Sequence, residues 1–171
     1  MANSALIDYI FSCFGSDLDG LNFELTETAP YDEKGLLSAN LERLRAAGAQ
    51  ISLDDFGTGY ASLINLRRFG FKEVKIDAEF ACSPGQTESI AMVKAIVAMA
   101  AALDARTVAE GIETADQVGL MQELGVDLLQ GHFFSYPLPC SRLLDWLDQQ
   151  GFPVPAAAPA QRARSGKGKP R

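Results

Sequence analysis

The stretch ISLDDFGTGYASL, residues Ile51–Leu63, decides how the rest of the chain is interpreted. A short β-rich run ends in two adjacent carboxylates, Asp54 and Asp55, and a turn with glycines on both sides of Thr58 follows at once. Two neighbouring acids that leave a strand repel each other unless a cation or a hydrogen-bond network compensates them. The glycines supply positive φ angles and allow a close approach of the backbone. Asp and Gly are also ordinary turn residues, so a solvated turn is the alternative for this stretch alone.

Length and composition indicate one globular domain. The chain has 171 residues, of which 47% are hydrophobic, enough for a sizeable core. No uncharged apolar run reaches the roughly 20 residues that a membrane span needs, and the first residues do not resemble a secretion signal. Three widely spaced cysteines, Cys13, Cys82 and Cys140, are expected to be reduced thiols. We therefore expect a cytoplasmic protein without a membrane span.

The net charge of −7 conceals an asymmetry. Residues 152–171 contain five basic residues and no acid, which leaves 10 basic against 22 acidic residues in the rest of the chain. Because this tail is rich in Pro, Ala and Gly, it is expected to be disordered, and a solvated tail without a function is favoured over one that binds nucleic acid or anionic lipid. An acidic body repels polyanions unless metal ions lie between them, so no DNA partner is expected.

Hydrophobic periodicity predicts alternating helices and strands. The expected strands are residues 21–24, 50–54, 73–76, 106–109 and 127–131, and the expected helices are residues 5–14, 36–44, 62–69, 88–103, 114–124 and 141–149. Gly48 is expected just after the second helix, and Thr114 with Gln117 forms a capping box. The helix at 88–103 is apolar nearly all round, which predicts a buried helix. Such alternation indicates an α/β fold whose parallel strands are joined by right-handed crossovers.

Polar residues stand at the carboxyl end of each expected strand, at intervals of 20 to 33 residues: Glu24, Asp54 with Asp55, Lys75 with Asp77, Glu110, and Gln130. In parallel sheets and barrels these ends meet on the face that holds active sites. Oxygen ligands without a partnering His or Cys suit Mg²⁺ or Mn²⁺. Two adjacent aspartates could bridge two such ions, with an ammonium nearby, and this arrangement indicates metal-assisted phosphoester hydrolysis.

The same residues carry a family resemblance. The motifs in question are FELTE (23–27), DDFGTGYASL (54–63), VKID (74–77), AEGIE (109–113) and QGHFFSYPLP (130–139). In this order and spacing they resemble the EAL domain, a (β/α)-barrel phosphodiesterase of bacterial second-messenger signalling that linearises cyclic di-GMP to pGpG. The resemblance implies that residues 1–151 form an incomplete EAL domain, a partial TIM-like barrel with its helices outside, and that residues 152–171 are the tail.

The resemblance also implies roles for individual residues. Glu24 and Asp54 would bind one metal, and Asp54, Asp55 and Glu110 a second, while Lys75 would contact the attacking water. Substrate contacts are implied for Asp77, Gln130, Gly131 and Pro137. Glu27 would anchor the loop that contains Phe56, Gly57, Thr58 and Gly59, which couples dimerisation to activity in the family, and Glu113 would have a supportive role.

Two departures from the family pattern matter. The sequence contains neither the Glu of an E-A-L motif nor the Asn of an N-L-S motif, so the first metal would lose two protein ligands. Without the opening strands, residues 21–24 would be an exposed barrel edge that favours a homodimer or another association. This chain by itself is therefore expected to be inactive or nearly so. The alternative is a non-catalytic remnant that binds cyclic di-GMP or a protein partner.

Overall fold

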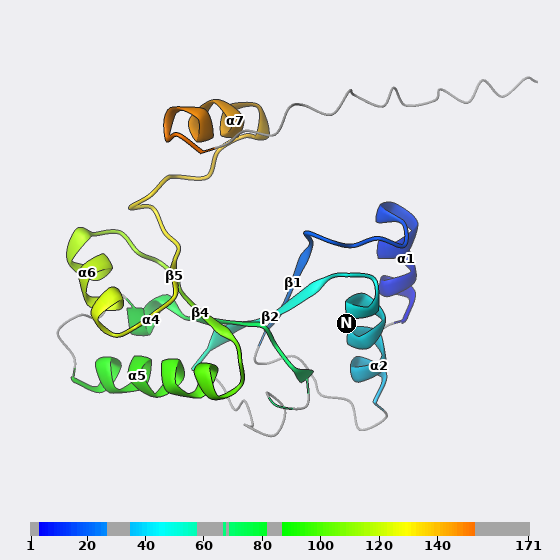
Figure 1. Cartoon of the computed structure of the whole chain (residues 1–171), viewed down its shortest axis with the longest axis horizontal. Coiled ribbons are helices and arrows are strands. Elements are labelled where there is room, and N and C mark those ends of the chain that lie inside the picture. Colours follow the sequence, from blue (N-terminus) through cyan, green and yellow to red (C-terminus); the bar gives the residue numbers. More distant parts are fainter. Residues whose placement is uncertain (1–3, 27–34, 58–66, 68, 82–86, 153–171) are drawn as a thin grey trace, which may run out of the picture. The chain divides into compact units, whose positions relative to one another are not determined.

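The computed structural model describes residues 4–26, 35–57, 67, 69–81 and 87–152, and the chain divides into two units, Met1–Tyr136 and Pro137–Arg171. The first unit contains a five-stranded parallel sheet in the order β1-β2-β3-β4-β5 (Figure 1). Its strands are β1 (Asn22–Thr26), β2 (Gln50–Phe56), β3 (Glu73–Ile76), β4 (Arg106–Ala109) and β5 (Leu128–Leu129). Its helices are α1 (Ser4–Phe14), α2 (Leu36–Ala46), α4 (Ala78–Ala81), α5 (Thr87–Ala102) and α6 (Ala115–Glu123). The predicted α/β fold with parallel strands is confirmed.

Local sequence signals set most element boundaries. Strands β3 and β4 have the predicted bounds, and α6 begins at the predicted capping box between Thr114 and Gln117. Gly48 (φ 96°) follows the C-cap of α2, as expected. Helix α4 was not predicted, and β5 is shorter than expected. The helix expected at 62–69 falls mostly outside the described residues.

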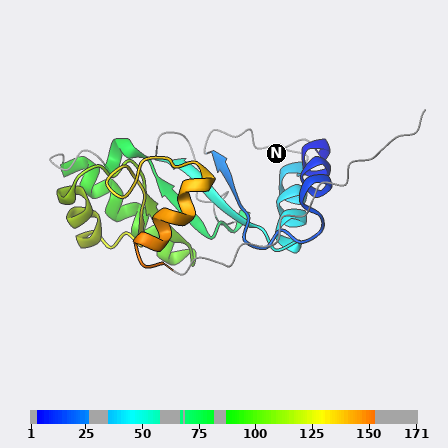
Figure 2. The same ribbon diagram turned by 90° about the horizontal axis from the view of Figure 1, so that it is seen from above.

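The first unit has two hydrophobic clusters. One lies where α1 and α2 pack beside β1 and β2, and the other where α4, α5 and α6 pack beside β3 and β4 (Figures 1 and 2). Phe56 and Met99 are partly buried against both clusters. The first cluster includes Leu25, Leu41, Leu44 and Leu53, and the second includes Val74, Ile76, Val93 and Met121. Helices thus cover one face of the sheet, and most of the described strand side chains on the other face are polar.

The prediction that the helix at residues 88–103 is buried is correct for one side of the helix and wrong for the rest. Only one side of α5 is buried, through Ser89, Val93, Ile96 and Ala100. The opposite side is exposed at Ala91, Ala95 and Ala98, and Met92 is exposed beside the buried stripe. Several of the exposed positions are alanines, whose small side chains cost little in contact with water.

Strand β1 pairs with β2 and forms one edge of the described sheet. The second unit contains α7 (Cys140–Gln149), an amphipathic helix with no buried residue. Its Leu143 and Leu144 are exposed. The predicted domain boundary at residue 151 stays a prediction, and tail residues 153–171 lie outside the described part. No helix among the described residues is long and apolar enough to cross a membrane.

Candidate functional site

A β-bulge lies at the pair of aspartates that ends β2. Leu53 pairs with Val74 and Phe56 with Ile76, so β2 has one residue more than β3 over this interval. Asp55 adopts a φ of 55°, in the left-handed region that few non-glycine residues occupy. Successive side chains of a regular strand point to opposite faces, but a bulge redirects one of them. The bulge therefore allows both carboxylates to face one site.

The structure brings three of the predicted metal ligands together. One carboxylate oxygen each of Asp54, Asp55 and Glu110 lies within 4.8 Å of the other two. Glu110 directly follows β4, and its backbone N–H donates to the carbonyl of Ile76 at 3.1 Å. Three acids from two strand ends thus form one half-buried cluster, as the convergence of strand ends predicted.

Lys75 joins this cluster to the first strand. Its Nζ lies 2.7 Å from Glu110 Oε1, 2.8 Å from Glu24 Oε1 and 2.9 Å from Asp54 Oδ1. The lysine side chain is only 7% exposed, whereas that of Glu24 is 48% exposed. Glu24 is not part of the three-acid cluster and meets it through the shared ammonium. The lysine therefore links carboxylates from three strands.

The surroundings of Lys75 keep it charged. Burial by itself would lower the pKa of the ammonium, but hydrogen bonds and ion pairs with Glu110, Glu24 and Asp54 outweigh this effect. The pKa of Lys75 is consequently held well above its usual value. The group is a fixed cation across the physiological pH range.

The pKa of Asp55 is raised, as expected for an acid close to other acids. Burial raises the pKa of its carboxyl, and the negative charges of Asp54, Asp77 and Glu24 raise it further, while Lys75 opposes the shift. The cluster contains more negative charge than its single lysine can balance. Such an excess is favourable for a site that takes up a divalent cation.

The donor set fits a hard cation. Asp54 Oδ1 is buried and, apart from the ion pair with Lys75, has no well-directed hydrogen bond from any residue that the structure describes. A buried carboxylate oxygen with spare acceptor capacity is suited to a metal. The ligand atoms are all carboxylate oxygens, which Mg²⁺ and Mn²⁺ prefer.

Two other predicted residues, Asp77 and Gly57, lie just after the carboxyl ends of β3 and β2 and contact α4. Asp77 Oδ1 accepts a hydrogen bond from the backbone N–H of Glu79 at 2.7 Å and so caps the first turn of α4. A Cβ on Gly57 (φ 110°) would come within 2.7 Å of the Phe80 ring. The close approach predicted for this glycine is thus made with a residue of α4.

The loops after β4 and β5 are joined by backbone contacts. Ile112 N–H donates to Gln130 O at 3.0 Å, and Phe133 N–H donates to Ile112 O at 2.9 Å. A Cβ on Gly131 would lie 2.1 Å from Ile112 O, so only glycine fits there. Gly131 therefore has a packing role in addition to the substrate contact that the resemblance implies, while the side chain of Gln130 is exposed.

The remaining predicted site residues are not members of the three-acid cluster or lie outside the description. Glu113 is exposed, and its backbone N–H donates to Gln117 Oε1 at 2.8 Å. Pro137 belongs to the second unit. Glu27, Thr58 and Gly59 lie outside the described residues.

A chain of polar side chains at the opposite end of the same strands was not predicted from the sequence. Ser52 Oγ donates to Asn22 Oδ1 at 3.2 Å, and Asn22 Nδ2 donates to Glu73 Oε1 at 3.2 Å. Arg106 Nη2 then contacts Glu73 Oε2 at 3.0 Å. The signal was available, because these residues precede Glu24, Asp54, Lys75 and Val108 by two positions and so share their face of the sheet.

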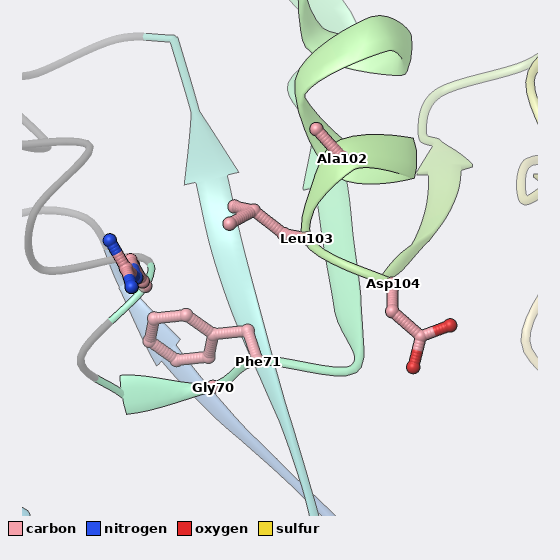
Figure 3. A pocket seen from close by; sticks show the side chains of 6 residues that line it. Gly70, Phe71, Ala102, Leu103 and Asp104 are labelled. Atoms are coloured by element: carbon pink, nitrogen blue, oxygen red, sulfur yellow. The ribbon is translucent and has the colours of Figure 1, made fainter.

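A cavity of about 500 Å³ lies away from the carboxylates, where Gly70 and Phe71 precede β3 and Leu103 and Asp104 precede β4 (Figure 3). Phe71 and Leu103 extend to the same side, and the Asp104 carboxylate points away from them. Asp104 contacts Lys72 Nζ at 2.6 Å, and this ion pair lowers the pKa of its carboxyl. Besides Asp104, the one charged residue that lines this cavity is Arg67, and the other lining residues are Gly70, Phe71, Ala102 and Leu103. This cavity has no group of acids, so the carboxylate cluster is the candidate site.

Comparison with known proteins agrees with this choice. The profile of the EAL domain matches residues 3–137. The chain belongs to the EAL-domain family. Its partial TIM-like barrel is the fold of that family, and curated relatives of this EAL domain are cyclic di-GMP phosphodiesterases.

Three similar proteins show the extent of the match. Cyclic di-GMP phosphodiesterase NbdA of Pseudomonas aeruginosa is 38% identical over 146 residues, which are 85% of this chain and 17% of NbdA. The structure of the PaMucR phosphodiesterase in complex with c-di-GMP is 39% identical, with a TM-score of 0.76, over 84% of this chain and 60% of that one. BlrP1 of Klebsiella pneumoniae, solved as a manganese and cyclic di-GMP complex, is 33% identical, with a TM-score of 0.67, over 78% of this chain and 34% of that one. This EAL domain thus spans less than two thirds of each relative.

Proposed function

We propose that this chain carries the metal-binding and water-orienting part of a cyclic di-GMP phosphodiesterase, and that by itself it does not turn the substrate over. The observation that carries this proposal is the cluster of Asp54, Asp55 and Glu110 around the buried ammonium of Lys75. Its acids stand at the ends of parallel strands, where barrel enzymes place their active sites. The relatives named above act on or bind cyclic di-GMP, which supports this nucleotide as the ligand.

Two divalent ions, Mg²⁺ or Mn²⁺, are part of this proposal. Asp54, Asp55 and Glu110 would hold one ion, and Glu24 with Asp54 would contribute to the other. Bound ions of this kind lower the pKa of water and stabilise the attacking and leaving oxygens of a displacement at phosphorus. The manganese in the BlrP1 complex supports the choice of metal.

The protein residues position the reactants. In this proposal Lys75 orients the attacking water and offsets phosphate charge, since its ammonium is buried among the carboxylates. Asp77 and Gln130 would contact the nucleotide. The substrate contacts implied for Gly131 and Pro137 are part of the same proposal. The loop residues Phe56 to Gly59, with Glu27 and Glu113, retain the organising roles that the resemblance implies.

Low activity of the isolated chain follows from its missing ligands. The Glu of an E-A-L motif and the Asn of an N-L-S motif are not in the sequence, and Glu24 is half exposed at the edge strand. Metal sites lose affinity steeply when ligands or their supports are removed. The second ion would keep its three carboxylates, and the first would be weakly held.

The test is direct. The chain is incubated with cyclic di-GMP and Mn²⁺, and pGpG is quantified by chromatography, with a complete EAL phosphodiesterase as the positive control. We expect less than one product molecule per protein molecule. Multiple turnovers that disappear in Asp54→Asn but persist in the surface variant Asp116→Asn would contradict the inactivity of the isolated chain.

Binding without catalysis is a second candidate. Phe133 and Phe134 are 45% and 46% exposed just after the Gln130 rim, and aromatic faces can stack on nucleobases. A titration with cyclic di-GMP would show saturable binding that weakens in Phe133→Ala more than in Phe152→Ala, a matched exposed aromatic. Absence of metal-dependent binding in the wild type would exclude this function.

Self-association through the β1 edge is also proposed. Next to that edge in sequence, α1 exposes Leu6, Tyr9 and Phe14, and an unpaired edge strand is a template for pairing. The oligomeric state can be measured by light scattering for Leu6→Lys and for Met92→Lys, since Leu6 and Met92 are 43% and 42% exposed. Only the first substitution should shift the protein toward the monomer, and a wild-type monomer at all concentrations would exclude association.

A further inference from the structure

Lys75 already contacts two of the three carboxylates on which the proposed metal site depends. An ammonium has three N–H donors, and Lys75 Nζ contacts one carboxylate oxygen each of Glu24, Asp54 and Glu110 at 2.7 to 2.9 Å. Two of these acids, Asp54 and Glu110, also belong to the three-acid cluster. The lysine and a divalent ion therefore require the same two side chains.

Asp54 and Glu110 cannot pair closely with the Lys75 ammonium and coordinate a divalent ion at the same time. An ammonium in contact with Asp54 and Glu110 repels a divalent ion bound to the same carboxylates, and the repulsion is strong where a site is shielded from water. Lys75 Nζ lies 2.9 Å from Asp54 Oδ1 and 2.7 Å from Glu110 Oε1. A metal that binds these two carboxylates therefore requires the lysine side chain to move away from them.

Glu24 can hold the ammonium after it leaves the other two carboxylates. It stands on β1, lies outside the three-acid cluster and is 48% exposed. A lysine side chain has four rotatable bonds, so Nζ can keep its contact with Glu24 while it leaves Asp54 and Glu110. The carboxylates of Asp54 and Glu110 then become available to a metal, and the ammonium stays paired with Glu24.

We propose that Lys75 is the resident counter-ion of this cluster, and that a divalent cation binds by displacing its ammonium from Asp54 and Glu110. Lys75 thereby stabilises the strands when the metal is absent and sets the metal affinity of the site. This inference rests on the proposed function, because it requires a metal at these carboxylates.

The first test compares Lys75→Met with Lys72→Met, whose lysine is 60% exposed and pairs with Asp104 outside the site. Mn²⁺ affinity is measured at pH 8 by calorimetry on the metal-stripped chain, together with the melting temperature in chelator. Lys75→Met should bind Mn²⁺ at least about tenfold more tightly and melt at a lower temperature without metal, because like-charge repulsion in the cluster is then uncompensated. Lys72→Met should match the wild type in both measurements.

A second test uses the wild-type chain, so its outcome does not depend on the folding of Lys75→Met. Acetylation by a lysine-directed reagent is quantified by peptide mass spectrometry with and without Mn²⁺. Labelling of Lys75 should increase several-fold with metal while that of Lys72 stays constant, because the displaced ammonium loses two of its acidic partners and becomes more accessible.

The outcomes separate the two proposals. Mn²⁺ binding that is equal in wild type and Lys75→Met, or Lys75 labelling that does not change at saturating Mn²⁺, would overturn the counter-ion inference and leave the metal site in place. A lack of Mn²⁺ binding in both proteins would overturn the metal site, and the counter-ion inference with it.

Discussion

The two ends of the sheet carry charged side chains on the same face of the same strands, yet they differ in balance. At the carboxyl end, one buried lysine faces four acids: Glu24, Asp54, Asp55 and Glu110. At the amino end, among the residues that the structure describes, Glu73 pairs with Arg106, and the polar groups of Asn22 and Ser52 complete the chain of hydrogen bonds. The charges of the side chains are thus balanced at the amino end and unbalanced at the carboxyl end, although the two networks are only two positions apart along each strand.

This difference indicates which end carries chemistry. A matched and partly exposed pair stabilises a protein only slightly, but it needs nothing further. An excess of partly buried acid is costly unless a cation compensates it, so such a cluster points to binding or catalysis. Charge balance, more than the mere presence of charged residues, distinguishes the two ends.

The largest expected effect is the loss of metal binding in Asp54→Asn. Asp54 belongs to the acid cluster and contacts Lys75, and removal of a ligand should weaken Mn²⁺ binding by about 100-fold or more. Calorimetry measures this change, and Glu73→Gln at the amino end is the control with unchanged affinity. Equal losses in both variants would mean that the two ends do not differ as described.

Gly131→Ala should have the next largest effect, on stability. The new methyl group would lie 2.1 Å from Ile112 O, and relief of that clash should cost about 3 kcal/mol of unfolding free energy. Gly119→Ala in α6 is the matched control, since its Cβ has nothing within 4 Å and alanine favours a helix by about 1 kcal/mol. Urea unfolding gives both values, and a stable Gly131→Ala variant would show that the joined loops at the carboxyl end are adaptable.

The unbalanced end should also give stability a dependence on pH. Because the pKa of Asp55 is raised in the folded state, the folded protein binds more protons than the unfolded one between the ordinary and the raised value. The free energy of unfolding should therefore fall as the pH rises through this interval. Unfolding in chelator at several pH values should show a smaller slope for Asp55→Asn, and identical slopes in both proteins would contradict this origin.

The sequence was enough to predict the order of the strands along the chain, but not the direction in which every side chain points. Alternation of apolar segments predicted five parallel strands, and their ends predicted that Asp54, Lys75 and Glu110 would meet. Regular alternation would turn Asp55 away from Asp54, and only the pairing of β2 with β3 reveals the bulge that brings it back. The contact between Gly131 and Ile112 likewise depends on two loops far apart in sequence, which no local pattern specifies.

The smallest expected effect is that of Arg106→Gln at the balanced end. The pair with Glu73 is 3.0 Å long, but the arginine side chain is 56% exposed, so its loss should cost only about 0.5 kcal/mol. Glu73 would keep its hydrogen bond from Asn22 Nδ2, which prevents an unpaired buried acid. Mn²⁺ affinity should stay within twofold of the wild type, because no fixed charge of the carboxylate cluster is removed. A change of tenfold or more would show that the amino end positions Lys75 through β3, and the two ends would then act as one electrostatic unit.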